Sequence, residues 1–94
     1  MKNILFVIHT DDIKKIDFVK KLSLSLRKKK ADVKIFLMSR GVKYSDKLKD
    51  YGFVSLCSRN AQEFSVQQIP EVEFASQYRL SEMIQEADMI LPII

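Results

Sequence analysis

Residues 3–12 of the 94-residue chain read NILFVIHTDD. The first seven of them form a largely apolar run rich in residues that favour β-strands. A run without polar alternation is typical of a central strand of a parallel sheet, which is buried on both faces. The next three residues, 10–12, are of the types that start helices. This stretch therefore predicts a buried parallel strand followed directly by a helix.

The same alternation continues along the chain. Apolar residues recur at helical spacing after residue 12, at Ile13, Ile16, Val19, Leu22 and Leu26, with Phe18 and Leu24 widening the stripe. Further strands are expected over residues 32–38, 53–57, 71–74 and 88–93. Further helices are expected over residues 44–51, 59–64 and 76–87. Gly52 stands where a helix should stop, and Ser58 and Ser76 stand where helices should be capped.

This order of elements predicts the fold class. The connections are too long for hairpins, so the strands should run mainly parallel, joined by right-handed crossovers. We expect a three-layer α/β/α sandwich around a mainly parallel five-stranded sheet, built as a single domain over residues 1–94.

Charge and composition narrow the classes of partner. The net charge is +4, and most of the basic residues lie in the first half of the chain. The basic run at residues 27–30 closes the first helix, where cations meet the negative end of the helix dipole. No nucleic-acid module is visible, and no apolar run is long enough to span a bilayer. We therefore expect no nucleic-acid or membrane partner. With no secretory signal and a single cysteine, we expect a cytoplasmic location.

Ligands of open parallel sheets bind outside the carboxyl ends of the strands. Segments 9–12, 39–41 and 57–60 should meet there, and the third begins with Cys57, the only cysteine. Free N–H groups of the following helix and a nearby arginine would favour its thiolate, the nucleophilic form. A buried, inert cysteine is the alternative. The candidate residues are Cys57 as nucleophile, with Ser58, Arg59, Asn60, His9 and Arg40 in supporting or binding roles.

Other chemistries fit the sequence less well. A Cys57–His9 pair could support a small hydrolase, but no third residue to orient the histidine is evident. No spacing suggests a metal site, and two glycines are too few for a phosphate loop or a dinucleotide fingerprint, so we expect no metal and no organic cofactor. The pair at residues 11–12 resembles the magnesium-binding aspartates of receiver domains. Because Cys57 occupies the place of the phosphoacceptor aspartate, we interpret that pair as a helix start.

Several segments resemble the DsrE/DsrF-like family, which includes the TusBCD and YchN-type sulfur-relay proteins. They are the opening strand with its long helix, residues 31–42 with their glycine turn, residues 53–61 with the cysteine, and the closing helix and strand from residue 76 to 91. The similarity is diffuse but runs from end to end.

The resemblance implies a function and partners. In sulfur-relay members the matching cysteine accepts sulfur as a persulfide and passes it on, a role that would fall on Cys57. The resemblance also implies a homo-oligomer (dimer, trimer or hexamer) or a complex with a paralogue, together with sulfur-donor and sulfur-acceptor proteins. The apolar segment 90–94 would suit an interface. The alternative is a non-catalytic oligomeric binding module that uses the strand-end cleft for a small anion or a protein partner.

Overall fold

The computed structural model describes residues 2–94, so Met1, the first residue of the expected domain, lies outside the described residues. The elements are β1 (Asn3–Ile8), α1 (Ile13–Lys28), β2 (Asp32–Leu37), the 3-10 helix η1 (Ser39–Tyr44), α2 (Ser45–Leu48), β3 (Phe53–Cys57), α3 (Ser58–Glu63), β4 (Val72–Ala75), α4 (Gln77–Glu86) and β5 (Met89–Ile93). The alternation of strands and helices predicted from the sequence is confirmed.

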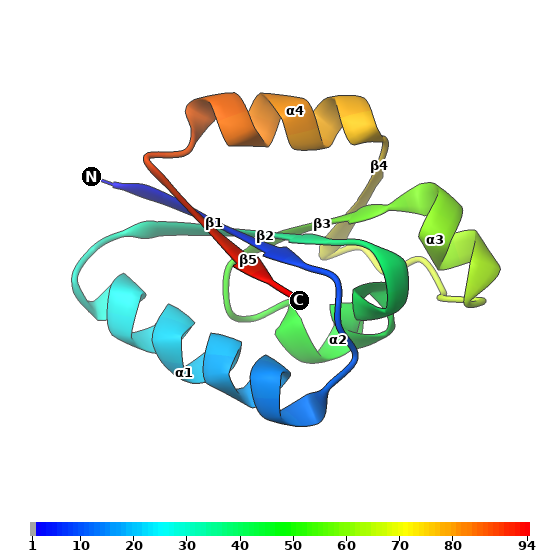
Figure 1. Ribbon diagram of the computed structural model, residues 1–94, viewed down its shortest axis with the longest axis horizontal. Helices are drawn as coiled ribbons and strands as arrows, with labels where there is room; N and C mark the ends of the chain where they lie inside the picture. The colour runs from blue at the N-terminus through cyan, green and yellow to red at the C-terminus, as the bar shows by residue number, and fades with distance from the viewer. Residues whose placement is uncertain (1) are drawn as a thin grey trace.

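The strands form one sheet in the order β4-β3-β2-β1-β5, and every neighbouring pair is parallel. Helices α1 and α2 cover one face and α4 covers the other, while α3 projects from the end of the sheet where β3 finishes (Figure 1). This is the predicted three-layer α/β/α sandwich. We call the two sides of the sheet the α1 face and the α4 face.

Helix α1 packs on the sheet through fewer residues than its apolar stripe predicts. Ile16 and Val19 are buried, but Phe18 is 56% exposed and Leu24 is 49% exposed. Ser23 is buried in their place, and its hydroxyl donates a hydrogen bond to the carbonyl of Tyr51. The prediction that Phe18 and Leu24 widen the buried stripe is therefore wrong, because the helix turns a serine and not these side chains toward the sheet.

The connection between β2 and β3 also differs from the prediction of one helix over residues 44–51. It begins with η1 and continues into the four-residue α2. A Cβ at Gly41 would lie 2.6 Å from the carbonyl oxygen of Ile8, and one at Gly52 would lie 2.7 Å from that of Val33. Neither glycine has a positive φ. Both are therefore needed for close backbone approach, and Gly52 is not a left-handed helix stop.

Left-handed helix stops do occur, at residues other than glycine. Lys30 follows α1 with a φ of 65°, and Ser65 follows α3 with a φ of 54°. After α1 the N–H of Ala31 donates to the carbonyl of Leu26 at 3.0 Å, and the N–H of Lys30 donates to that of Arg27 at 2.9 Å. This pair of bonds is a Schellman motif, which ends the helix and brings Ala31 back toward Leu26.

Candidate functional site

A hollow of about 630 Å³ lies at the carboxyl edge of the sheet, where β2, β3 and β4 end. Its lining comes from the last residues of β3 and β4 and from the residues that follow the three strands: Met38, Ser39, Cys57, Ser58, Arg59, Asn60, Ala75, Ser76 and Gln77. None of these lining residues is acidic, and Arg59 carries the one positive charge among them. The hollow is therefore suited to a neutral or anionic group.

Cys57 is the last residue of β3 and lies beside Ala75 of β4. It is 6% exposed, and it belongs to a small apolar cluster on the α4 face with Leu5, Val7, Phe36 and Met83. Because Cys57 also lines the hollow, its side chain stands between the core of the α4 face and the open edge of the sheet.

The turn from β3 into α3 occurs one residue earlier than predicted. Cys57, with φ −71° and ψ 113°, is itself the residue at the N-cap, and Ser58 is already the first residue of the helix. No side chain caps this helix start. The prediction that Ser58 caps the helix is wrong because the chain stays extended through Cys57, which still pairs with β4, and then turns at once.

Asn60 connects the ends of two strands. Its Oδ1 accepts a hydrogen bond from the backbone N–H of Ser39 at 2.8 Å, and its Nδ2 donates to Oε1 of Glu63 at 3.3 Å. Ser39 has a φ of 53°, a left-handed conformation that costs energy for a residue with a Cβ. The Asn60 side chain thus holds the chain after β2 against α3, and so helps to fix one wall of the hollow.

The structure brings together four of the candidates and separates two. Ser58 and Arg59 are exposed at the hollow beside Cys57 and Asn60. His9 does not line the hollow: it follows β1, its N–H donates to the carbonyl of Ile93 at 2.9 Å, and β2 lies between β1 and β3. Arg40 is exposed in η1 and is also not among the lining residues.

Sequence reasoning missed the wall of the hollow contributed by β4 and α4. Just as Cys57 ends β3 and residues 58–60 follow it, Ala75 is the last residue of β4 and Ser76 and Gln77 follow it. The strand-end rule, applied to this short strand as well, would have found them. Ser76 is the N-cap residue of α4 as predicted, although its side chain makes no capping hydrogen bond.

A polar network fastens α4 to the sheet next to this wall. Oε1 of Glu73 accepts hydrogen bonds from Nε of Arg79 at 2.9 Å and from the buried hydroxyl of Ser55 at 3.0 Å. The hydrogen bond to Glu73 raises the pKa of Arg79 above its ordinary value. The guanidinium also lies 5.9 Å from the centre of the Phe53 ring. Contacts of charged groups therefore help to hold α4 on this face of the sheet, whereas apolar packing holds the helices on the other face.

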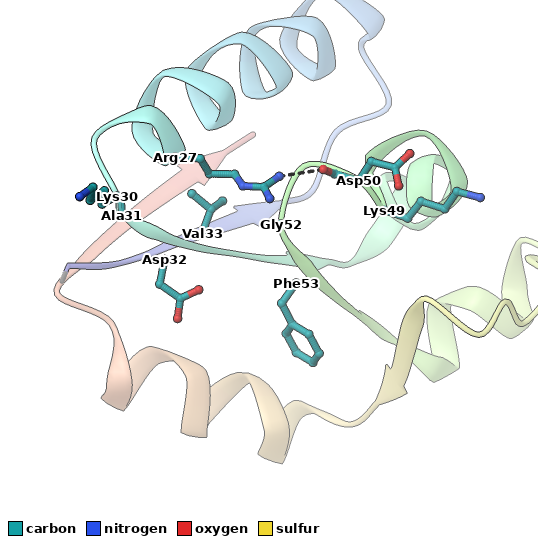
Figure 2. A pocket seen from close by; sticks show the side chains of 9 residues that line it. All are labelled: Arg27, Lys30, Ala31, Asp32, Val33, Lys49, Asp50, Gly52 and Phe53. Carbon is teal, nitrogen blue, oxygen red and sulfur yellow. Dashed lines mark hydrogen bonds between the residues drawn. The ribbon is translucent and has the colours of Figure 1, made fainter.

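A second hollow, of about 390 Å³, lies at the opposite edge of the sheet (Figure 2). Nη1 of Arg27 donates to the carbonyl of Asp50 at 2.8 Å, so this cation is already engaged. Lys49 pairs with Asp46 at 3.2 Å, and this hydrogen bond raises the pKa of Lys49. In Figure 2 the side chain of Lys49 extends away from the centre of the hollow, and Lys30 lies at the opposite margin from Lys49. These cations do not converge, so the hollow is not an anion site.

Residues 2–94 contain neither a cluster of metal-binding side chains nor a helix suited to a membrane. No group of three or more histidine, cysteine or acidic side chains is placed to hold a metal ion within this part of the chain. Over the same residues, no helix combines the length and the apolar character that crossing a bilayer requires.

Comparison with known proteins identifies the architecture. No protein-family model matches the chain, and no curated protein sequence matches it. The crystal structure of the YchN protein from E. coli is similar, with a TM-score of 0.80 and 20% sequence identity over 98% of this chain and 99% of that chain. The chain therefore shares the fold of YchN over essentially its whole length.

Proposed function

We propose that this protein is a sulfur carrier of the DsrE type, in which Cys57 accepts a sulfur atom as a persulfide and passes it to another protein. The observation that carries the proposal is the place of the only cysteine, at the end of a central strand and on the wall of the hollow at the carboxyl edge. The fold shared with YchN supports it at the level of architecture.

The chemistry needs a thiolate and a sulfur donor but no external oxidant. The Cys57 thiolate attacks the terminal sulfur of a donor persulfide. The donor's S–S bond breaks, and the donor's own cysteine sulfur leaves as a thiolate. The terminal sulfur is now joined to Cys57 by a new S–S bond. Transfer onward repeats the exchange, with an acceptor thiolate as the attacking group. Such a carrier works where free thiols persist, as in the cytosol.

Neighbouring residues would assist this exchange in different ways. Arg59 supplies positive charge at the rim, which favours the thiolate and the persulfide anion alike. Asn60 would act as a positioning residue, because its hydrogen bond to Ser39 holds the wall opposite β4. His9 has no role in the proposed exchange, because it does not line the hollow.

Burial of Cys57 favours a second candidate function. At 6% exposure the thiol is largely covered by the α4 face, as an inert structural cysteine would be. In that case the hollow itself would bind a small anion or a protein partner, with no covalent step. Both candidates use the same cavity, and they differ in whether the sulfur atom can be reached.

We also propose that the protein assembles with itself or with a paralogue. Edge strand β5 leaves Ile90 41% exposed, and Ile94 just after it is 78% exposed. Apolar side chains on an unpaired strand edge are typical of an interface.

The test is native mass spectrometry after incubation with a cysteine desulfurase and cysteine, which reports both the sulfur load and the assembly state. We expect a gain of one sulfur atom, about 32 Da, that dithiothreitol removes. Cys57→Ser should show no gain. Arg59→Gln should load more slowly, whereas Lys47→Gln, an exposed cation on α2, should load like the wild type.

The outcome against the carrier is equally clear. If the wild type gains no sulfur, and Cys57 reacts with iodoacetamide only after denaturation, the binding module is the correct interpretation. A spectrum containing only monomers at micromolar concentration would contradict the proposed assembly.

A further inference from the structure

A groove of about 710 Å³ lies at the amino edge of the sheet, at the end of the molecule opposite Cys57. In Figure 1 this is the region where the end of α1 approaches the starts of β1 and β5. Its apolar floor is formed by Ile4, Leu26, Ala31 and Met89. A volume in this range and a mainly apolar lining are characteristic of sites for small ligands.

The floor of the groove is built from fixed parts of the fold. Ile4 and Met89 are register partners on the adjacent strands β1 and β5. Leu26 and Ala31 are joined by the Schellman hydrogen bond that ends α1. Ile4 is 3% exposed, whereas Met89 is 47% exposed, so the floor runs from the core out to open surface. The groove therefore offers a ligand a preformed apolar surface.

The rim of the groove is positive. The remaining lining residues are Lys2, Lys29 and Lys30, all exposed, and no acidic residue lines the groove within residues 2–94. None of these three lysines forms an ion pair with another described residue. Lys30 also lines the neighbouring hollow, and in Figure 2 it lies at the margin of that hollow, apart from Arg27 and Asp50. Helix-dipole stabilisation accounts for Lys29 and Lys30 just after the end of α1, but not for the apolar floor beside them.

We propose that this groove binds a free aliphatic carboxylate, with the hydrocarbon chain on the apolar floor and the carboxylate among the three lysines. Burial of methylene groups supplies the favourable free energy, and the cations select an anionic head group. A second copy of the chain is a poorer occupant, because it would bring its own lysine rim toward this one. The site is separate from Cys57 and does not depend on the proposed sulfur chemistry.

Isothermal titration of the whole protein with dodecanoate, below its micelle-forming concentration, tests the site. We expect saturable binding of one dodecanoate per chain that weakens as salt is added, because salt screens the lysines. Dodecyltrimethylammonium, which has the same tail and the opposite charge, should bind at least about tenfold more weakly. Cys57→Ser should bind dodecanoate like the wild type.

Matched variants locate the binding. The double variant Lys29→Gln/Lys30→Gln should lower the affinity for dodecanoate about tenfold, because two contacts to its carboxylate are lost. Lys20→Gln/Lys21→Gln removes the same charge from within α1, away from the groove, and should change affinity less than about twofold. Met89→Gln should also lower the affinity, because it makes the apolar floor more polar. Circular dichroism would confirm that each variant folds. The proposal would be overturned if dodecanoate and dodecyltrimethylammonium bound equally well, or if the two lysine double variants lowered the affinity equally. It would also be overturned if dodecanoate bound only when the protein associated.

Discussion

The two faces of the sheet are built differently. The α1 face buries a cluster of fourteen apolar residues, drawn from β1 to β4 and from α1, η1, α2 and α3. The α4 face buries a cluster of five, and Cys57 is one of them. On that side the Glu73–Arg79 and Lys34–Glu86 ion pairs, at 2.9 and 3.2 Å, supplement the packing.

This difference separates stability from access to the cysteine. Hydrophobic burial grows with the apolar area removed from water, so the α1 face contributes most of the stabilising free energy. Exposed ion pairs contribute little each, and they are weakened by salt. We therefore expect the layer over Cys57 to open at a smaller cost than the layer on the α1 face, as the proposed sulfur carrier would require.

The largest expected effect is on the α1 face. Phe6 is fully buried at the centre of its cluster, so Phe6→Ala should lower the free energy of unfolding by about 3–5 kcal/mol. Urea denaturation followed by circular dichroism measures this as a shift in the midpoint. Leu24→Ala, on the exposed side of α1, is the control and should change stability by less than about 0.5 kcal/mol. Near-native stability of Phe6→Ala would contradict the assignment of the main core to this face.

The next effect is on the α4 face. Met83 is 1% exposed and belongs to the same cluster as Cys57. Met83→Ala should lower the free energy of unfolding by about 2 kcal/mol. It should also speed iodoacetamide alkylation of Cys57 in the folded protein, because fewer side-chain atoms then cover the thiol. Ile84→Ala, on the exposed side of α4, should leave both quantities nearly unchanged. If Phe6→Ala accelerates alkylation as much as Met83→Ala does for each kcal/mol of stability lost, the faces do not open separately.

The sequence was sufficient to predict the fold because most strands are marked by a local apolar run, and β4 by the alternation of apolar and acidic residues. It failed where distant backbone sets the local structure. The 3-10 start of η1 depends on Gly41 lying against the carbonyl of Ile8, which no nearby residue reveals. Likewise, a serine and a lysine occupy the left-handed helix stops at positions 65 and 30, where glycine would have been expected.

The candidate site was predicted in part for a related reason. Cys57 and the residues after it are contiguous, so one strand end located them together. His9 follows β1, whose end lies outside the hollow, and Arg40 follows β2 but lies one residue beyond Ser39, the last residue after that strand to line the hollow. The bond between Asn60 and the N–H of Ser39 joins segments separated by 21 positions, and its role became visible only with the strands side by side.

The smallest effect concerns the ion pair that holds α4. Arg79→Gln should lower stability by no more than about 1 kcal/mol, because the pair is partly exposed and Glu73 keeps its hydrogen bond from Ser55. Its informative readout is the salt dependence of Cys57 alkylation. In the wild type the rate should rise with ionic strength as salt weakens the pair. In Arg79→Gln it should start higher and rise less, while Lys21→Gln, which removes an exposed charge from α1, should keep the wild-type dependence. Identical salt dependence in all three proteins would mean that apolar packing alone holds the α4 face closed over the cysteine.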